Sequence, residues 1–306
     1  MKAIIFGVNG QDGYYLSELL RKRNIEIFGV SPCEDTWIKG DVADFEFVEA
    51  LIKSHQPKYI FHFAANSTTS HAALFDNHKA ISTGTLNILE SVRLHCPTAK
   101  VFLSGSAMQF KNEGLPINEY SPFEASSYYS VARIQSVYAG RYFRNTYGMK
   151  VYMGYFFNHD SPLRTERHVN MKIAMAVRQI SRGSVKKLEL GNIDVQKEFN
   201  YAGDIVDAVW LLINQDSVFE TIIGSGKVYS IKDWLEYCFL KINKNWQDFV
   251  EIDQKYVPEY KVLISDPTLI KRIGWQPKVD FYQLADLMIG DLKSQFVSLN
   301  FENQRG

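Results

Sequence analysis

The stretch AIIFGVNGQDGYYLSELL, residues 3–20, joins a short apolar run to a helical pattern through three glycines. Gly7, Gly10 and Gly13 follow the spacing G-x-x-G-x-x-G, directly between the predicted strand and the predicted helix. Glycine permits a tight turn and lets the main chain approach a pyrophosphate, which the N-terminus of the helix attracts. The glycines could serve a tight turn alone, but their position favours a dinucleotide site.

The alternation of strands and helices continues through the first half of the chain. Strands are predicted at 3–7, 25–30, 58–65, 100–106 and 150–157, and helices at 14–23, 84–95 and about 127–147. This order predicts an α/β fold, a Rossmann-type doubly wound parallel sheet with a smaller C-terminal substrate-binding lobe. The dinucleotide-binding domain is predicted to comprise 1–157 with 199–220, and the lobe 158–198 with 221–306. Segments 158–170 and 227–234 are predicted to be loops.

Composition narrows the class of protein. The 306 residues include 34 basic and 34 acidic side chains, without a long run of either sign, which argues against nucleic acid or a membrane surface as partner. Three widely spaced cysteines indicate a reducing compartment and no disulfide frame. The seven histidines lack metal-ligand spacing, so no metal site is predicted. No signal peptide fits and no apolar run reaches about 20 residues, so a cytoplasmic protein is expected.

The residues after the second predicted strand bear on the choice of cofactor. An acidic residue there favours NAD, because it binds the ribose hydroxyls. This chain has Ser31 at that point, which favours NADP, although Glu34 and Asp35 follow closely and NAD remains possible. Asp41, in GDVAD, is predicted either to approach the adenine or to be a turn residue.

Five segments resemble the extended short-chain dehydrogenases/reductases, and within them the GDP-mannose 4,6-dehydratase branch. They are GVNGQDGYYLSELL (7–20), HFAA (62–65), FNHDSPLR (157–164), LGNIDVQKEFNYAGDIVDAVW (190–210) and SDPTLIKRIGWQPKV (265–279). The resemblance spans nearly the whole chain. It implies a nucleotide-sugar substrate, GDP-linked as in that branch, and places Gln11, Asp12 and Ala64 with the three glycines at the cofactor.

The resemblance also assigns the reacting residues. The hydroxyl of the family falls on Ser106, its tyrosine on Tyr129, its lysine on Arg133, and the glutamate used in dehydration on Met108. Residues four apart share one face of a helix, so Tyr129 and Arg133 are both expected at the cofactor. A tyrosine that transfers a proton near neutrality needs a nearby positive charge, because its unperturbed pKa is about 10. In the alternative, Arg133 lies at a solvated edge and Tyr129 is merely packed.

Methionine at position 108 decides the predicted reaction. Met108 cannot transfer a proton, and Glu113 comes several residues too late to replace the acid. We therefore expect NADP(H)-dependent reduction of a GDP-linked 4-keto-6-deoxy sugar with Tyr129 as proton donor. GDP-mannose 4,6-dehydratase or epimerase activity is one alternative. A catalytically inactive dinucleotide-binding protein is another, because both the lysine and the glutamate are replaced.

On the substrate side, Asn158 is expected to contact the sugar nucleotide together with Ser106 and Met108. Lys172 and Lys197 are expected to neutralise its diphosphate, although either could be a surface charge. The arginine-rich loop that builds tetramers in the family is replaced by the short SPCEDTWIKG, 31–40. A homodimer is therefore expected, formed by the helix that begins near residue 83 and the helix of Tyr129.

Overall fold

A seven-stranded parallel sheet forms the centre of the molecule. The structure, a computed structural model, describes residues 1–33, 36–185, 187–253 and 255–290. The strand order is β11-β6-β5-β4-β1-β2-β3, and every neighbouring pair is parallel. This confirms the predicted doubly wound α/β fold. The strands are β1 (Lys2–Phe6), β2 (Glu26–Ser31), β3 (Ile38–Lys39), β4 (Tyr59–His62), β5 (Lys100–Ser106), β6 (Lys150–Phe156) and β11 (Glu220–Ile223).

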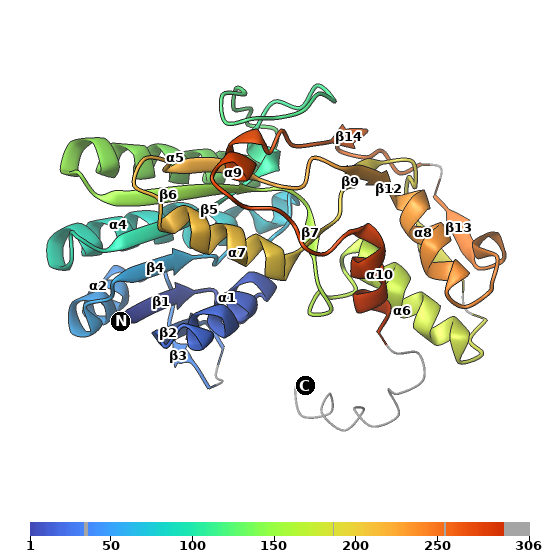
Figure 1. Ribbon diagram of the computed structural model, residues 1–306, viewed down its shortest axis with the longest axis horizontal. Helices are drawn as coiled ribbons and strands as arrows, with labels where there is room; N and C mark the ends of the chain where they lie inside the picture. The colour runs from blue at the N-terminus through green and yellow to red at the C-terminus, as the bar shows by residue number, and fades with distance from the viewer. Residues whose placement is uncertain (34–35, 186, 254, 291–306) are drawn as a thin grey trace.

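Helices cover both faces of this sheet (Figure 1). On one face lie α1 (Gln11–Lys22) and α7 (Ala202–Ile213), and on the other α2 (Phe45–His55), α4 (Gly84–His95) and α5 (Tyr128–Tyr147). Successive side chains of β1 point to opposite faces of the sheet, so helices are needed on both. Ala3 and Ile5 join the core under α1 and α7, whereas Ile4 and Phe6 join the opposite core. All four side chains are fully buried, as expected for a central parallel strand.

Local signals fix the ends of α5, which carries the predicted tyrosine. Ser127 caps its N-terminus in a capping box with Ser130, and Gly148 ends it with a φ of 67°. The structure confirms the helix predicted at about 127–147 and the helix predicted at 84–95, which is α4. Before α4 the chain forms η1 (His71–Ala73), α3 (Leu74–Asn77) and a π-helical turn, η2 (His78–Thr83). Over the described ranges, no helix combines the length and apolar character needed to cross a membrane.

The strand order reverses between β1 and β4, and the glycine turn lies at that point. Gly7 has a φ of 87°, and a Cβ on it would lie 2.6 Å from the main-chain nitrogen of Ala64. A Cβ on Gly13 would lie 2.4 Å from the carbonyl oxygen of Gly7. Glycine is therefore required at both positions, and α1 begins tightly against the turn. In open α/β sheets such a reversal is where ligands bind.

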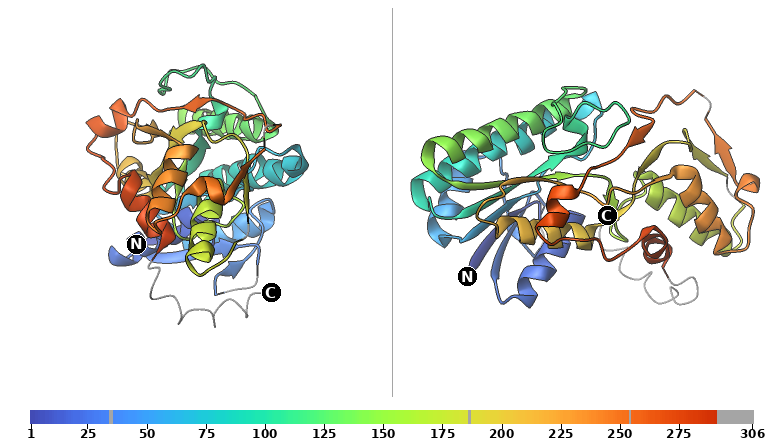
Figure 2. Two further views of the ribbon diagram at one scale, coloured as in Figure 1. Left: turned by 90° about the vertical axis from the view of Figure 1, so that its right-hand side faces the viewer. Right: turned by 45° about the horizontal axis from the view of Figure 1, so that its top comes forward.

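A second, smaller body lies beyond the carboxyl ends of the main strands (Figures 1 and 2). It has its own apolar core, to which Met171, Trp234 and Phe281 contribute. We call it the lobe. Its helices are α6 (Val169–Ser181), α8 (Ile231–Leu240) and α10 (Phe281–Ile289), and its strands are β8 (Leu188–Leu190), β9 (Gln196–Glu198), β12 (Val228–Ser230), β13 (Val250–Ile252) and β14 (Val262–Leu263). The remaining short elements are η3 (Ala107–Gln109), η4 (Trp246–Asp248), β7 (His159–Asp160) paired with β10 (Asn200–Tyr201), and α9 (Thr268–Arg272).

One predicted loop was wrong. Segment 227–234 contains β12 and the start of α8, because Ser230 and Asp233 form a capping box that begins the helix. The Ser-x-x-Asp spacing carries this signal in the sequence. Segment 158–170 is mostly irregular, but it contains β7 and the start of α6.

Packing suggests where to draw the domain limits. The predicted limit at residue 220 would cut β11, which continues to Ile223 in the main sheet. Trp275 lies in the core beside α7, and its Nε1 donates to the carbonyl oxygen of Asp204 at 2.9 Å. We therefore propose that the dinucleotide-binding domain comprises 1–157, 199–223 and 268–275, and that the lobe comprises the other described residues. The predicted end of the lobe, 291–306, lies outside the described residues.

Candidate functional site

Two adjoining cavities open at the carboxyl ends of the main strands. The first, of about 800 Å³, lies at the ends of β1, β2 and β4 and is called the glycine-loop cavity here. The second, of about 850 Å³, lies between the ends of β5 and β6 and the lobe, and is called the lobe cavity. Both are lined by Asn66 and Asp76, so they form one continuous crevice. An extended two-part ligand fits this shape.

Four of the predicted cofactor residues line the glycine-loop cavity: Gly7, Gly10, Asp41 and Ala64. Gly10 is the N-cap of α1 and supplies no side-chain cap, so the first N–H groups of the helix remain to bind an anion. Asp41 accepts from the main-chain nitrogen of Ala43 at 2.9 Å, which also makes it a turn residue.

Three further predicted cofactor residues, Gln11, Gly13 and Ser31, line neither cavity, whereas Asp12, Tyr129 and Arg133 line the lobe cavity. The side-chain amide of Gln11 donates to the carbonyl oxygen of His159 at 3.2 Å and accepts from Ser161 at 2.9 Å. Ser31 is buried, and its hydroxyl accepts from Asn9 Nδ2 at 2.7 Å. Gly13 acts through the close packing of α1 described above. The side chains of Gln11 and Ser31 are thus committed to contacts within the protein. The neighbouring acids at 34 and 35 lie outside the described residues.

Ser106, Met108 and Tyr129 all line the lobe cavity, as the prediction requires. Ser106 ends β5, and its hydroxyl oxygen accepts from the main-chain nitrogen of Met108 at 3.2 Å. Gln109 Oε1 accepts from the main-chain nitrogen of Ser106 at 2.9 Å, which completes a capping box. With its oxygen already accepting, the Ser106 hydroxyl keeps its proton to donate to a ligand oxygen.

Arg133 lies in the interior and not at a solvated edge. It is 5% exposed, its Nη1 donates to the Ser104 hydroxyl at 2.8 Å and to the Ser104 carbonyl, and its Cζ lies 5.1 Å from the ring centroid of Tyr129. Burial, together with the charge of Arg133, lowers the pKa of His62 to about 3, so His62 stays neutral. Arg133 lines the lobe cavity, and its buried Nε has no hydrogen-bond partner among the described residues. A donor of this kind fits an acceptor group on a ligand.

On the lobe side, Asn158 and Lys197 line the same cavity. Lys197 is 8% exposed, and its Nζ lies 5.3 Å from the ring centroid of Phe199. Burial lowers the pKa of Lys197, and the charge of Asp160 opposes that shift. A buried ammonium that faces the cavity suits an anionic ligand, because the ligand supplies a compensating charge at close range.

Lys172, the other predicted diphosphate residue, does not line the cavity. It is exposed on α6, and its Nζ donates to the carbonyl oxygen of Glu189 at 2.6 Å. The expectation that it neutralises a diphosphate in this cavity is therefore not supported by its position. Tyr256 and Tyr260 line the cavity from the segment before β14, and the Tyr260 hydroxyl lies 3.5 Å from Asn158 Oδ1.

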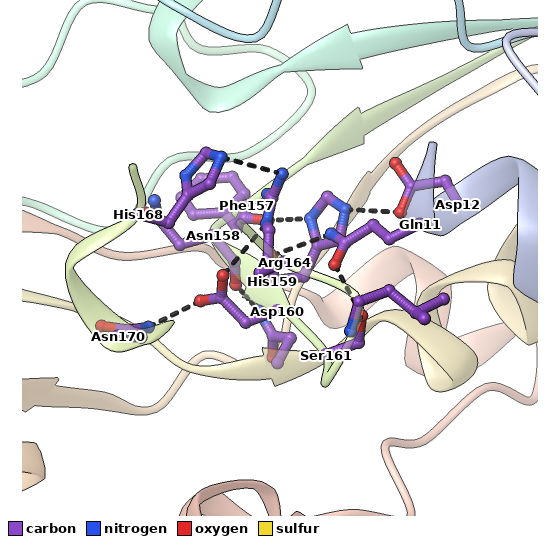
Figure 3. A network of polar contacts seen from close by, with 12 residues as sticks. Gln11, Asp12, Phe157, Asn158, His159, Asp160, Ser161, Arg164, His168 and Asn170 are labelled. Atoms are coloured by element: carbon purple, nitrogen blue, oxygen red, sulfur yellow. Dashed lines mark hydrogen bonds and ion pairs between the residues drawn. The ribbon is translucent and has the colours of Figure 1, made fainter. Parts of the chain in front are cut away.

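The charged residues that follow Asn158 were not among the predicted site residues (Figure 3). Arg164 Nε donates to Asp160 Oδ1 at 3.1 Å. Burial by itself would raise the pKa of Asp160, but the positive groups around it, led by Arg164 and Lys197, together outweigh burial and lower that pKa. Burial and Arg164 lower the pKa of His168 to about 4. A run of polar residues directly after a buried strand was the available signal. In the described part of the chain, no three His, Cys, Asp or Glu side chains are grouped so as to hold a metal ion.

Known proteins resemble this chain over nearly its whole length. A family described as GDP-mannose 4,6 dehydratase matches residues 4–288. GDP-mannose 4,6 dehydratase 1 of Arabidopsis thaliana is 30% identical over 94% of this chain and 89% of its own. GDP-mannose 4,6-dehydratase of Vibrio cholerae is 26% identical over 95% of this chain and 94% of its own.

Two solved structures show the same fold. The UDP-glucose 4-epimerase complex with NAD from Thermus thermophilus has a TM-score of 0.81 at 18% identity, covering 96% of this chain and all of that one. RMD from Pseudomonas aeruginosa, complexed with NADPH, has a TM-score of 0.83 at 20% identity, covering 96% and 97%. The sequence matches and these folds confirm the resemblance drawn from the sequence.

Proposed function

The chain belongs to the GDP-mannose 4,6-dehydratase family, and from this premise we propose that it reduces the C4 ketone of a GDP-linked 4-keto-6-deoxy hexose with NADPH. One observation carries the proposal. Ser106 and Tyr129, two hydroxyl donors, line one cavity together with Met108, the residue that the sequence resemblance places where the family has its dehydrating glutamate. Reduction of a ketone needs a hydride and a proton, and it needs no group that removes a proton from C5.

The crevice suits a nicotinamide dinucleotide. The tight glycine turn, the uncapped start of α1 and the buried Nε of Arg133 would hold its pyrophosphate and a ribose. When bound, the cofactor supplies the hydride. We propose NADP over NAD because Lys39 and Lys79 line the glycine-loop cavity and Ser31 stands where NAD enzymes place an acid. NAD remains the alternative, and comparing the dissociation constants of NADPH and NADH distinguishes them.

Six residues that line the lobe cavity have proposed tasks in the reaction. The Ser106 hydroxyl donates to the C4 carbonyl oxygen and polarises it, and the Tyr129 hydroxyl supplies the proton that this oxygen gains. Arg133 holds its positive charge beside the Tyr129 ring. Lys197 neutralises the diphosphate, and Asn158 contacts the nucleotide sugar. Met108 contributes only an apolar wall.

Dehydration of GDP-mannose is the second candidate, and family membership favours it, because the curated relatives carry that name. It requires an acid or base over C5 and C6, which Met108 cannot provide. Epimerisation also needs a second proton-transfer group. A third candidate, a binding protein without turnover, rests on the replacement of both the family lysine and the family glutamate.

One experiment separates these candidates. The purified protein is incubated with NADPH and a panel of GDP-linked 4-keto-6-deoxy sugars, and in parallel with GDP-mannose alone. We expect stoichiometric loss of NADPH absorbance and a product two hydrogens heavier than the ketone. Formation of a 4-keto-6-deoxy product from GDP-mannose, without net use of cofactor, would establish the dehydratase instead. Inertness on the whole panel together with NADPH binding would establish the binding protein.

We also propose a homodimer in the cytoplasm. α4 and α5 lie side by side and expose large apolar side chains: Leu86, Leu94, Tyr138 and Tyr142. Pairing this face with a second copy would remove it from water. Cys33, Cys96 and Cys238 are free, which suits a reducing compartment.

A further inference from the structure

The glycine turn and the substrate segment are joined by side chains that lie almost 150 residues apart in the sequence (Figure 3). Asp12 belongs to the first turn of α1, and its Oδ1 lies 2.9 Å from His159 Nε2. The Gln11 amide spans from the carbonyl oxygen of His159, at 3.2 Å, to the Ser161 hydroxyl, at 2.9 Å. Gln11 and His159 are each 8% exposed and Ser161 is fully buried. The Gln11 contacts are therefore shielded from water, whereas the Asp12 side chain is 20% exposed and lines the lobe cavity with His159.

The hydrogen-bond pattern gives His159 a positive charge. Its Nδ1 lies 2.8 Å from the carbonyl oxygen of Phe157, which can only accept, and its Nε2 faces a carboxylate, which also accepts. Both ring nitrogens must then donate, as in the imidazolium form. Burial opposes that charge, but the charge and hydrogen bond of Asp12 outweigh burial and raise the pKa of His159. The other charged or titratable groups that act on the pair are Arg164, Arg133, Asp160 and His168.

The network continues from His159 into the lobe. Asp160, the next residue, accepts from Arg164 Nε at 3.1 Å and from Asn170 Nδ2 at 2.6 Å. Asn170 is in the first turn of α6, which packs in the core of the lobe. On its other side His159 adjoins Asn158, which lines the lobe cavity. One chain of contacts thus leads from the start of α1 to the start of α6.

We propose that Asp12 and His159 are positioning residues that make binding of the dinucleotide and of the sugar nucleotide interdependent. The inference rests on the proposed function, because it assumes that both ligands bind in this crevice. A ligand that orders the glycine turn also orders the segment from Asn158 to Asn170, so the second ligand finds its site already arranged. The same coupling must act in both directions, since the two affinities are thermodynamically linked.

Binding measurements without turnover test this inference. The dissociation constant of NADPH is measured by calorimetry with and without saturating GDP, and that of GDP with and without saturating NADPH. In the wild-type protein we expect each ligand to tighten the other by the same factor, about tenfold. In Asp12→Asn and in His159→Gln the factor should fall below about twofold, and the double variant should lose no more than either single one.

Two controls keep the result interpretable. His95→Gln removes a histidine that also faces a carboxylate, with its Nε2 2.9 Å from Glu49 Oε1, but that lines neither cavity, so it should retain the coupling. Thermal unfolding shows whether a variant remains folded. Hydrogen exchange in the wild-type protein offers a second measurement, in which NADPH should slow exchange of amides 164–170.

The outcomes separate the two proposals. If neither NADPH nor GDP binds the wild-type protein, the proposed function fails. If both bind independently, or if folded His159→Gln keeps the full coupling factor, this inference is overturned and the proposed function stands. Raising the pH should also reduce the coupling, because His159 loses its charge as the pH passes above its raised pKa.

Discussion

Arg133 lies one helical turn after Tyr129 and holds its guanidinium 5.1 Å from the centre of the tyrosine ring. Nη1 of the same guanidinium donates to Ser104 on β5, so the arginine joins α5 to the strand that ends at Ser106. A flexible ammonium could not make the ring contact and both Ser104 contacts with the same geometry. The arginine is therefore built into the site, which argues against a chance replacement at a solvated position.

Tyr129→Phe removes only the transferable proton. The phenyl ring keeps its contact with Arg133, so we expect NADPH binding to change by less than about twofold. Turnover of a 4-keto sugar should fall by about a hundredfold or more, as for loss of a general acid. Calorimetry and single-turnover absorbance measure the two effects. Retention of turnover in Tyr129→Phe would exclude the tyrosine as the proton donor.

Arg133→Ala should change both stability and the ionisation of a neighbour. Two Ser104 acceptors lose their donor in the interior, and we expect a loss of about 2–3 kcal/mol in the free energy of unfolding. After burial, the charge of Arg133 is the next cause of the low pKa of His62, so removing it should raise that pKa. An NMR titration of His62 measures the shift. Arg133→Lys is the control, since its positive charge should keep the pKa low.

Met108→Glu tests the assignment of the reaction. A carboxylate at this position would restore a proton-transfer group to the lobe cavity, and we expect slow formation of a 4-keto-6-deoxy product from GDP-mannose, detected by mass. Met108→Gln has a similar shape without an ionisable group, so it should give none. A wild-type protein that dehydrates GDP-mannose at an ordinary enzymatic rate would contradict the reductase proposal.

Glu220 should stabilise the edge of the main sheet in a pH-dependent way. Burial would raise its pKa, but hydrogen bonds from Arg141, Arg144 and Tyr155 outweigh burial and lower the pKa of Glu220 to about 2. A carboxylate with a lowered pKa contributes its full stability above its ordinary pKa of 4.5 and loses it as the pH falls towards 2.

Glu220→Gln measures that contribution. We expect it to lower the free energy of unfolding by about 2–3 kcal/mol at neutral pH, because two partly buried arginines lose their partner. The difference from wild type should shrink in acid, as followed by urea unfolding between neutral pH and pH values near 2. Glu113→Gln, in an exposed pair with Lys111, should leave the free energy of unfolding nearly unchanged. Equal effects of the two variants would argue against a special role for Glu220.

If the protein is a homodimer that pairs through α4 and α5, a charge placed in that interface should lower its molar mass in solution. Tyr142→Glu on α5 places a charge in the exposed apolar face, and light scattering after gel filtration should then report a monomer where the wild type is a dimer. Tyr120→Glu is the matched control, because Tyr120 is 92% exposed and lies outside α4 and α5. A wild-type monomer, or a Tyr142→Glu dimer, would count against this interface.

The sequence by itself determined the features that depend on short-range spacing. The apolar runs and the helical patterns between them predicted the parallel sheet, because a strand buried on both faces is a short continuous apolar run, whereas a covering helix buries one face with a period of about 3.6 residues. The glycines of 7–13 predicted the turn. The four-residue spacing placed Tyr129 and Arg133 on one face of α5, and Ser106 followed from the end of β5. The Ser230–Asp233 capping box was also readable, although the prediction missed it.

Only the tertiary structure decided which polar residues meet. Lys172 and Lys197 look alike in the sequence, yet Lys197 lies buried on β9, the middle strand of its small sheet, and Lys172 is exposed on α6. Asp12 and Gln11, expected at the cofactor, direct their side chains to His159 and Ser161. Such pairings join segments almost 150 residues apart. A local sequence pattern does not predict them, because they follow from how the lobe packs on the ends of the strands.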